Sequence, residues 1–394
     1  TKGYDYEAVL SKGQYAEEPL GLGYIASYCK KYTDVDIKII DAHIFAIDKI
    51  FSNPDIKFEN IEKELIDSMV NYNPDIIGVS CLFHKLAKHA HVLIGKIKKC
   101  LPDVKIVIGG SYPTASPEHA LRDANIDLAV IGEGEEAMLK ILKFYRGDLK
   151  QEELDSVAYM KDGNITIKPV KKIVMDIDEF GVPERNPQYL KKYSALGRHF
   201  FDKIKDNDQD VIATITSSRG CPFNCTFCIS VKMWHRRLRF RNVENVLDEI
   251  DGLKRNFGIK YLVFNDDNMT INREFTMKLC QGMIDRKFNI KWSVSGGLYV
   301  PSLDEKLVDM MIKSGFNIFT LAIESGSQEI LDSIRKKVRL SEIAEKVNML
   351  RKFDAYIEGY FMLGFPEETE KQLKMTIDFS AGLDLDWRCY QCVQ

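Results

Sequence analysis

Residues 211–229 read VIATITSSRGCPFNCTFCI, an apolar stretch that runs directly into a loop with three closely spaced cysteines. The apolar and β-branched residues of Val211–Ser217 predict a buried strand. Cys221, Cys225 and Cys228 follow it with the spacing C-x3-C-x2-C. Cysteine thiolates are the usual ligands of iron–sulfur clusters. Three of them would leave the fourth iron of a [4Fe–4S] cluster open to an outside ligand, so we expect such a cluster at the end of this strand.

Two other uses of the cysteine loop stay open at this point. A structural zinc site is closed by four ligands, and His235 is the nearest further candidate. An electron carrier of the ferredoxin type needs a fourth cysteine, for which Cys280 would have to be brought close by folding. In either case the chain would be a non-catalytic iron–sulfur or zinc protein.

Strands and helices alternate from residue 211 onward. Six strand–helix units predict a partial (β/α)6 barrel, whose active site lies at the carboxyl ends of its strands. The expected strands are Val211–Ser217, Tyr261–Asn265, Lys291–Ser295, Ile318–Ile323, Ile357–Leu363 and Arg388–Gln391.

The first part of the chain also alternates strands and helices, which predicts a doubly wound, Rossmann-like parallel sheet. The expected strands are Val35–Ile40, Asp75–Ser80, Val104–Ile108 and Asp127–Ile131. Ligands of such sheets bind at the carboxyl ends of the strands. Gly109-Gly110-Ser111 and Gly132-Glu133-Gly134 follow two of these ends, where glycine lets the backbone approach a ligand closely.

We therefore expect an α/β protein with three parts. Residues 1–146 form the doubly wound domain, residues 147–205 form a linker with a hairpin that turns at Asp162-Gly163, and residues 206–394 form the barrel. The barrel ends with its sixth strand, so a C-terminal region beyond it is expected to be absent.

The composition and charge of the chain argue against several classes of protein. The chain has 394 residues, of which 45% are hydrophobic and 29% charged, and its net charge is −3. Dispersed basic residues argue against nucleic acid as a partner. No apolar stretch is long enough to span a bilayer. Nine cysteines, an odd number, do not suggest a disulfide framework, so we expect a cytoplasmic protein.

The cysteine loop resembles that of the radical S-adenosylmethionine (SAM) superfamily, in which an aromatic residue precedes the last cysteine, as Phe227 does here. The resemblance extends from about Val211 to the end of the chain. It implies a [4Fe–4S] cluster whose open iron chelates SAM, which is then cleaved reductively to a 5′-deoxyadenosyl radical. It also implies an external one-electron donor of the flavodoxin or ferredoxin type.

Several further motifs carry this resemblance. Asp266 or Asp267 would accept a hydrogen bond from the SAM amino group, and Glu324 ends the fourth barrel strand where a polar contact to SAM is expected. The stretch Gly359–Glu367 (GYFMLGFPE) resembles one whose backbone meets adenine. The SAM-binding residues implied are Phe227, Asp266, Asp267, Ser295, Glu324, Lys336, Gly364 and Phe365.

The N-terminal part resembles the cobalamin (B12)-binding domain of cobalamin-dependent radical SAM enzymes. The resemblance is carried by Pro19–Tyr24 (PLGLGY), Gly109–Thr114 (GGSYPT), Pro117–Leu121 (PEHAL) and Ile131–Glu135 (IGEGE). It implies that the nucleotide tail of cobalamin threads into the sheet. The cobalamin-binding residues implied are Leu20, Gly21, Ser80, Gly109, Gly110, Ser111, Tyr112, Thr114, Gly132, Glu133 and Gly134.

A histidine ligand to cobalt is not expected from the loop that supplies it in methionine-synthase-type domains. Residues 1–18 contain no histidine, and Asp41-Ala42-His43 follows the second strand, with Ala46 where that motif has glycine. Tyr112 or a residue of 1–18 could approach the cobalt instead. The first strand of the cobalamin sheet is expected to precede residue 1.

We expect a cobalamin-dependent radical SAM enzyme that methylates an unactivated carbon of a small-molecule or peptide substrate. An oxidative cyclase or rearrangement enzyme with the same cofactors but without methyl transfer is the alternative. The sequence itself names no substrate.

Overall fold

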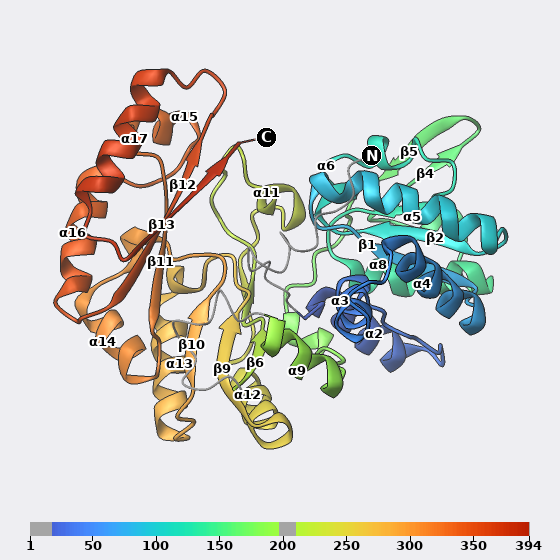
Figure 1. The fold of residues 1–394 in the computed structure, drawn as a ribbon, viewed down its shortest axis with the longest axis horizontal. Coiled ribbons are helices and arrows are strands. Elements are labelled where there is room, and N and C mark those ends of the chain that lie inside the picture. Colours follow the sequence, from blue (N-terminus) through green and yellow to red (C-terminus); the bar gives the residue numbers. More distant parts are fainter. Residues whose placement is uncertain (1–17, 197–209, 394) are drawn as a thin grey trace.

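The computed structural model describes residues 18–196 and 210–393. These residues form two α/β bodies that lie next to each other (Figure 1). We call residues 18–168 the N-terminal body and residues 211–393 the barrel. Helix α9 (Pro187–Leu196) packs against α3 (Ala42–Ser52) of the first and β6 (Val211–Ile215) of the second. None of the described helices is both long enough and apolar enough to span a bilayer.

The N-terminal body is built on a five-stranded sheet. Its order is β1-β2-β3-β4-β5, with the first three strands parallel and the last two antiparallel. The strands are β1 (Ile76–Ser80), β2 (Lys105–Gly109), β3 (Leu128–Val130), β4 (Val157–Lys161) and β5 (Asn164–Lys168).

Helices cover both faces of this sheet, as expected for a doubly wound fold. On one face, α4 (Phe58–Tyr72) and α5 (Ala87–Cys100) pack their buried isoleucines against β2 and β3. On the other face, α8 (Gly134–Arg146) packs against the same strands, and α2 (Leu20–Tyr32) lies on α8. The turns α6 (Ser111–Ala115) and α7 (Pro117–Ala120) follow β2.

Two expectations for this region differ from the structure. Residues 34–40 form neither a helix nor a strand, so the strand expected at Val35–Ile40 is not formed. The expected hairpin is present as β4 and β5, with positive φ at Asp162 and Gly163. It pairs with β3 through Ala129–Ala158 and therefore extends the first sheet.

The barrel contains six parallel strands that follow each other in space in chain order. Two three-stranded ladders, β6-β9-β10 and β11-β12-β13, are joined by the parallel bridges Trp292–Phe316 and Leu298–Leu321. The partial (β/α)6 barrel is thereby confirmed. Its strands after β6 are β9 (Ile259–Phe264), β10 (Lys291–Val294), β11 (Ile318–Glu324), β12 (Tyr356–Leu363) and β13 (Trp387–Cys392).

Helices cover the outer face of the barrel strands (Figure 1). They are α12 (Val243–Phe257), α13 (Arg273–Asp285), α14 (Glu305–Lys313), α16 (Leu340–Arg351) and α17 (Glu370–Gly382). Trp292 lies at the centre of the core beneath them, with ring centroids 5.3 Å from Phe264 and 4.6 Å from Phe316, both edge-on. This arrangement fixes β9 to β11, and with them the loops at their carboxyl ends.

Buried ion pairs fasten the segment between the two bodies to the barrel. Arg185 donates to Glu18 at 2.6 Å, to Glu249 of α12 at 3.0 Å and to the backbone oxygen of Thr214 in β6 at 2.7 Å. Glu249 also pairs with Arg241. The side chains of Glu249 and Arg241 are both 4% exposed, so each charge depends on its partner.

Glu249→Ala should destabilise the protein by about 3–5 kcal/mol, because Arg185 and Arg241 would keep buried charges with one partner missing. The measurement is the free energy of unfolding from anaerobic urea titrations followed by circular dichroism. Glu244→Ala on the same helix is the control. The Glu244 side chain, paired with Arg286, is 70% exposed, so its loss should cost at most about 1 kcal/mol. Equal losses for the two variants would contradict this assignment.

Candidate functional site

The cysteine loop begins after the short strand β7 (Ser218–Arg219), at the carboxyl end of β6. It rests on the segment after α15 (Gln328–Ser333): the Thr226 N–H donates to the Ile334 carbonyl at 3.0 Å, and the Cys225 thiol lies 3.9 Å from the Arg335 carbonyl. Cys221, Cys225 and Cys228 are all partly exposed. The loop is therefore held by backbone bonds while its sulfur atoms stay accessible.

The electrostatic surroundings of the thiols come from both strands and loops. Burial raises the pKa of Cys225, Lys336 lowers it, and Cys221 and Glu324 raise it. Burial also raises the pKa of Cys228 to about 11. Within the described residues, no three Cys, His, Asp or Glu side chains are close enough to ligate one metal ion.

The chemistry of the donor set fits an iron–sulfur cluster, whose usual protein ligands are cysteine thiolates. The loop also keeps Phe227 beside the thiols, with its ring 5.9 Å from that of Phe365. The donor set of three thiols from one exposed loop thus fits a [4Fe–4S] cluster with one open iron.

The two aspartates after β9 are engaged with the protein itself. Asp266 accepts from the Ser217 N–H at 2.8 Å and from the Ser217 and Ser218 hydroxyls at 2.6 Å each. Burial raises the pKa of Asp266 to about 6. Asp267 accepts from the Gly220 N–H at 3.0 Å. Both carboxylates therefore fix the strand end from which the cysteine loop departs.

Asn268 is a residue that sequence reasoning missed. Its side-chain amide donates to the Cys221 sulfur at 3.6 Å, while its Oδ1 atom is buried without a partner among the described residues. Asn268 is 4% exposed. The sequence did contain a sign that Asn268 belongs to the site, because Asn268 directly follows the two aspartates in the run NDDN.

Glu324 and Lys336 form an ion pair of 2.8 Å beside Cys225. Glu324 ends β11 with φ of +73°, next to a register shift in its pairing with β12. Such backbone conformations are costly and concentrate at functional sites. The structure thus joins Glu324 and Lys336, both predicted from the sequence to contact SAM, in one ion pair.

The remaining SAM-binding candidates lie around the same end of the barrel. Ser295 donates to the Asn265 side chain at 2.8 Å. Gly364 has φ of +83° and open space where a side chain would stand. The Gly364 and Phe365 amides both donate to Glu368, so these two residues form a turn at the end of β12.

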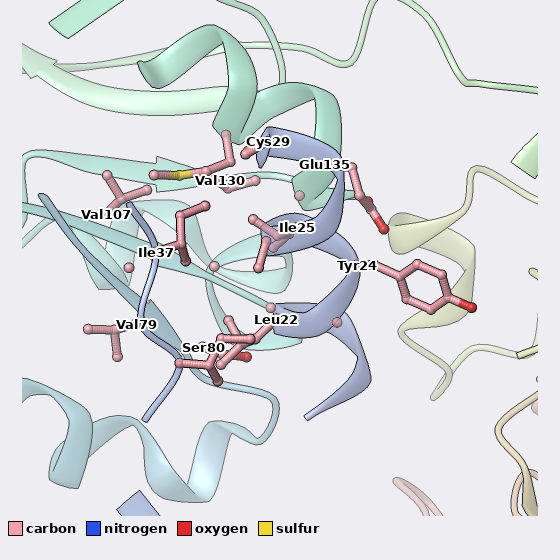
Figure 2. A pocket seen from close by; sticks show the side chains of 18 of the residues that line it. Leu22, Tyr24, Ile25, Cys29, Ile37, Val79, Ser80, Val107, Val130 and Glu135 are labelled. Atoms are coloured by element: carbon pink, nitrogen blue, oxygen red, sulfur yellow. The ribbon is translucent and has the colours of Figure 1, made fainter. Parts of the chain in front are cut away.

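A cavity of about 1030 Å³ lies between the two bodies. This volume is at the upper end of the range of small-molecule sites, about 300–1,000 Å³. Figure 2 shows Ile25, Ile37 and Val130 turned toward a common space, with Tyr24 and Glu135 on the side of the barrel. All the cobalamin-binding candidates line the cavity except Tyr112 and Thr114.

The cavity continues from the carboxyl ends of β1, β2 and β3 to the barrel. There it is lined by Asn265 and Asp267 after β9, and by Ile229 and Ser230 directly after the cysteine loop. Trp234 also lines the cavity on the side of the barrel. One space therefore connects the end of the first sheet with the vicinity of the thiols.

Tyr112 and Thr114 support the cavity wall from behind. The buried Tyr112 hydroxyl lies 2.8 Å from His91 Nε2 and 2.7 Å from His119 Nδ1. The Thr114 hydroxyl donates to the Gly110 carbonyl at 2.8 Å and accepts from the Gly132 N–H at 3.0 Å. These two residues hold the glycine turns in place.

Gly110 is required by the backbone itself. Its φ is +101°, and a Cβ atom there would stand 2.7 Å from the Cys81 carbonyl oxygen.

Asp41 caps α3 by accepting hydrogen bonds from the His43 and Ile44 amides at 2.8 and 3.0 Å, so the Asp41-Ala42-His43 run is a helix start. The other candidates near the cobalt, residues 1–17, lie outside the described residues.

Glu133 lines the cavity but directs its carboxylate to the barrel. It accepts from Arg219 at 2.8 Å and from Arg239 at 2.7 Å, and Glu135 accepts from Arg219 at 2.6 Å. The Arg219 guanidinium also lies over the rings of Tyr24 and Phe180. Sequence reasoning missed Arg219, although it stands two positions before Cys221. We call these four charged residues the interbody network.

Two family models match the chain. The model of the radical SAM superfamily matches residues 215–380, and that of the B12 binding domain matches residues 6–142. An uncharacterized methyltransferase of Pyrococcus horikoshii is 29% identical, covering 94% of this chain and 74% of that protein. The cytidylyl-2-hydroxyethylphosphonate methyltransferase of Streptomyces wedmorensis is 27% identical, covering 88% and 69%.

Further similarity extends to another named activity and to a solved structure. An anaerobic magnesium-protoporphyrin IX monomethyl ester cyclase of Rubrivivax gelatinosus is 25% identical, covering 94% of this chain and 64% of that protein. The radical SAM methyltransferase TsrM from Kitasatospora setae, solved with cobalamin and a [4Fe–4S] cluster, superposes with a TM-score of 0.74 at 14% identity. It covers 96% of this chain and 70% of that one, and at this identity the likeness concerns the fold.

The family of the chain follows from these matches together with the cysteine loop and the two-body architecture. The protein belongs to the radical SAM superfamily and carries a B12-binding domain ahead of its radical SAM domain.

Proposed function

We propose that the protein is a cobalamin-dependent radical SAM methyltransferase. The observation that carries the proposal is one cavity that reaches from the glycine turns of the first sheet to the residues on either side of the cysteine loop. When bound, the cluster supplies the electron that cleaves SAM to a 5′-deoxyadenosyl radical, and cobalamin supplies a carrier for a methyl group. Two cofactors that share one cavity can act on one substrate without exposing a radical to solvent.

Cys221, Cys225 and Cys228 hold the cluster in this proposal. Lys336 attracts the SAM carboxylate, with Glu324 holding the lysine in place at 2.8 Å. The orphaned Oδ1 of Asn268 is the acceptor left for the SAM amino group, since Asp266 and Asp267 are already hydrogen-bonded. The turn at Gly364 and Phe365 contributes the backbone and ring that face adenine, together with Phe227.

Cobalamin would lie in the N-terminal part of the cavity. Ser80, Gly109 and Gly132 line it at the ends of adjacent strands, where the absence of side chains on the glycines allows close approach. The indole of Trp234 and the phenol of Tyr24 line the barrel side and would exclude water. Burial raises the pKa of Tyr24 to about 12, so Tyr24 stays neutral there.

The proposal extends to partners and location. The electron would come from an external donor of the flavodoxin or ferredoxin type, and the methyl acceptor would be a carbon of a small molecule or peptide. We also propose a cytoplasmic location, because thiolate ligands of a cluster need a reducing compartment. The division of the chain into an N-terminal domain, a connecting segment and a barrel remains part of this proposal, with the hairpin of β4 and β5 joined to the first sheet.

Each of Cys221→Ala, Cys225→Ala and Cys228→Ala should lose most of the iron, expected at about four per chain in the reconstituted protein, and all reductive SAM cleavage. Iron content and 5′-deoxyadenosine are measured after anaerobic reconstitution. Cys100→Ser is the control, because Cys100 is exposed at the end of α5. Stoichiometric zinc in the unaltered protein, with no SAM cleavage, would overturn the proposal.

Gly78→Leu should abolish cobalamin retention. Gly78 lies in β1 and lines the cavity, and a Cβ atom there meets no atom within 4 Å, so the leucine fills the cavity without a clash. Bound cobalamin is measured by absorbance after gel filtration. Gly252→Leu on α12 is the control, with equally open space outside the cavity. Unchanged retention in the Gly78 variant would place cobalamin elsewhere.

The similarity to the cyclase supports a second candidate function, which is oxidative cyclisation without methyl transfer. The two functions differ in their SAM products. A methyltransferase that uses SAM both for methylation and for radical formation should release S-adenosylhomocysteine and 5′-deoxyadenosine in comparable amounts. Liquid chromatography of turnover mixtures with candidate substrates measures both. Deoxyadenosine formed with substrate but without S-adenosylhomocysteine would favour the cyclase.

A further inference from the structure

Asn268 is positioned against a cluster ligand by the buried start of the helical turn that follows β9. Its side chain is 4% exposed, and the next two residues, Met269 and Thr270, are 1% and 0% exposed. The Nδ2 atom lies 3.6 Å from the sulfur of Cys221. This is the range of an N–H···S hydrogen bond, which is longer than one to oxygen because sulfur is larger.

The orientation of the Asn268 amide follows from the chemistry of its neighbour. A cysteine that ligates iron is a thiolate and can only accept. The reversed amide would place its carbonyl oxygen against that negative sulfur and would be repelled. The N–H must therefore face Cys221, which leaves Oδ1 buried and without a partner, as the structure has it.

Neighbouring residues fix this geometry before any cofactor binds. Asp266 holds Ser217 and Ser218, and Asp267 holds the Gly220 N–H at 3.0 Å, one residue before Cys221. The run that carries Asn268 is therefore tied to the segment that leads into Cys221. An amide held in this way acts on the sulfur with little reorganisation.

We propose that Asn268 is a positioning residue that sets the reduction potential of the cluster through its hydrogen bond to Cys221. The proposal rests on the cluster of the proposed function. A donor directed at a thiolate stabilises the more negative, reduced state of a cluster and so raises its potential. Asn268 makes the cluster easier to reduce by the external donor, independently of SAM.

The test is a redox titration of the reconstituted full chain followed by electron paramagnetic resonance, without SAM. Asn268→Ala should keep its iron but shift the midpoint potential to more negative values. Asn268→Asp, which has the same shape but replaces the donor with a negative charge, should shift it further. Asn268→Ser, which restores an O–H donor, should recover part of the shift. Asn348→Ala, an exposed asparagine on α16, should leave the potential unchanged.

The outcomes separate this proposal from the cluster assignment. If the unaltered protein binds no iron, the proposed function itself fails. If it binds iron and the Ala and Asp variants titrate at its potential, the role of Asn268 is overturned. Loss of iron in Ala, Asp and Ser variants alike would also overturn it, because Asn268 would then be needed for cluster assembly rather than for its potential.

Discussion

The interbody network is the interaction on which the rest of the site depends. Burial alone would lower the pKa of Arg219, but Glu135 and Glu133 raise it above its usual value. The two glutamates belong to the end of the first sheet and the start of α8, and the arginine leads into the cysteine loop. Charges buried in this way require well-placed partners, so the sheet, α8 and the loop keep one relative position.

This placement explains how two ordinary folds form one site. The carboxyl ends of parallel strands are where both a doubly wound sheet and a barrel bind ligands. Here the two sets of strand ends face a common cavity, with Gly110 and Gly132 on one side and Asp267 on the other. Charged residues at the boundary pair with each other, and the cavity wall consists mostly of apolar side chains and glycine backbone.

Sequence patterns predicted the strands of both sheets, apart from Val35–Ile40, and the three-cysteine loop, because alternation and spacing are local properties. They also predicted the part of the cavity lining that the glycine turns form, since such turns mark strand ends. They could not predict the hydrogen bonds that Asp266 and Asp267 accept, because Ser217 and Gly220 approach them only through tertiary packing. For the same reason the contacts of Tyr112 with His91 and of Glu133 with Arg219 could not be predicted from the sequence.

The interbody network also limits how the chain can change over generations. Arg219 and Arg239 come from the barrel, while Glu133 and Glu135 come from the N-terminal body. Replacing one body with that of a distant homologue would leave either two buried cations without anions or two buried anions without cations, unless all four positions changed together. The two halves should therefore be inherited and diversify as a matched pair, and chimeras should survive only when the charged positions are transferred as a set.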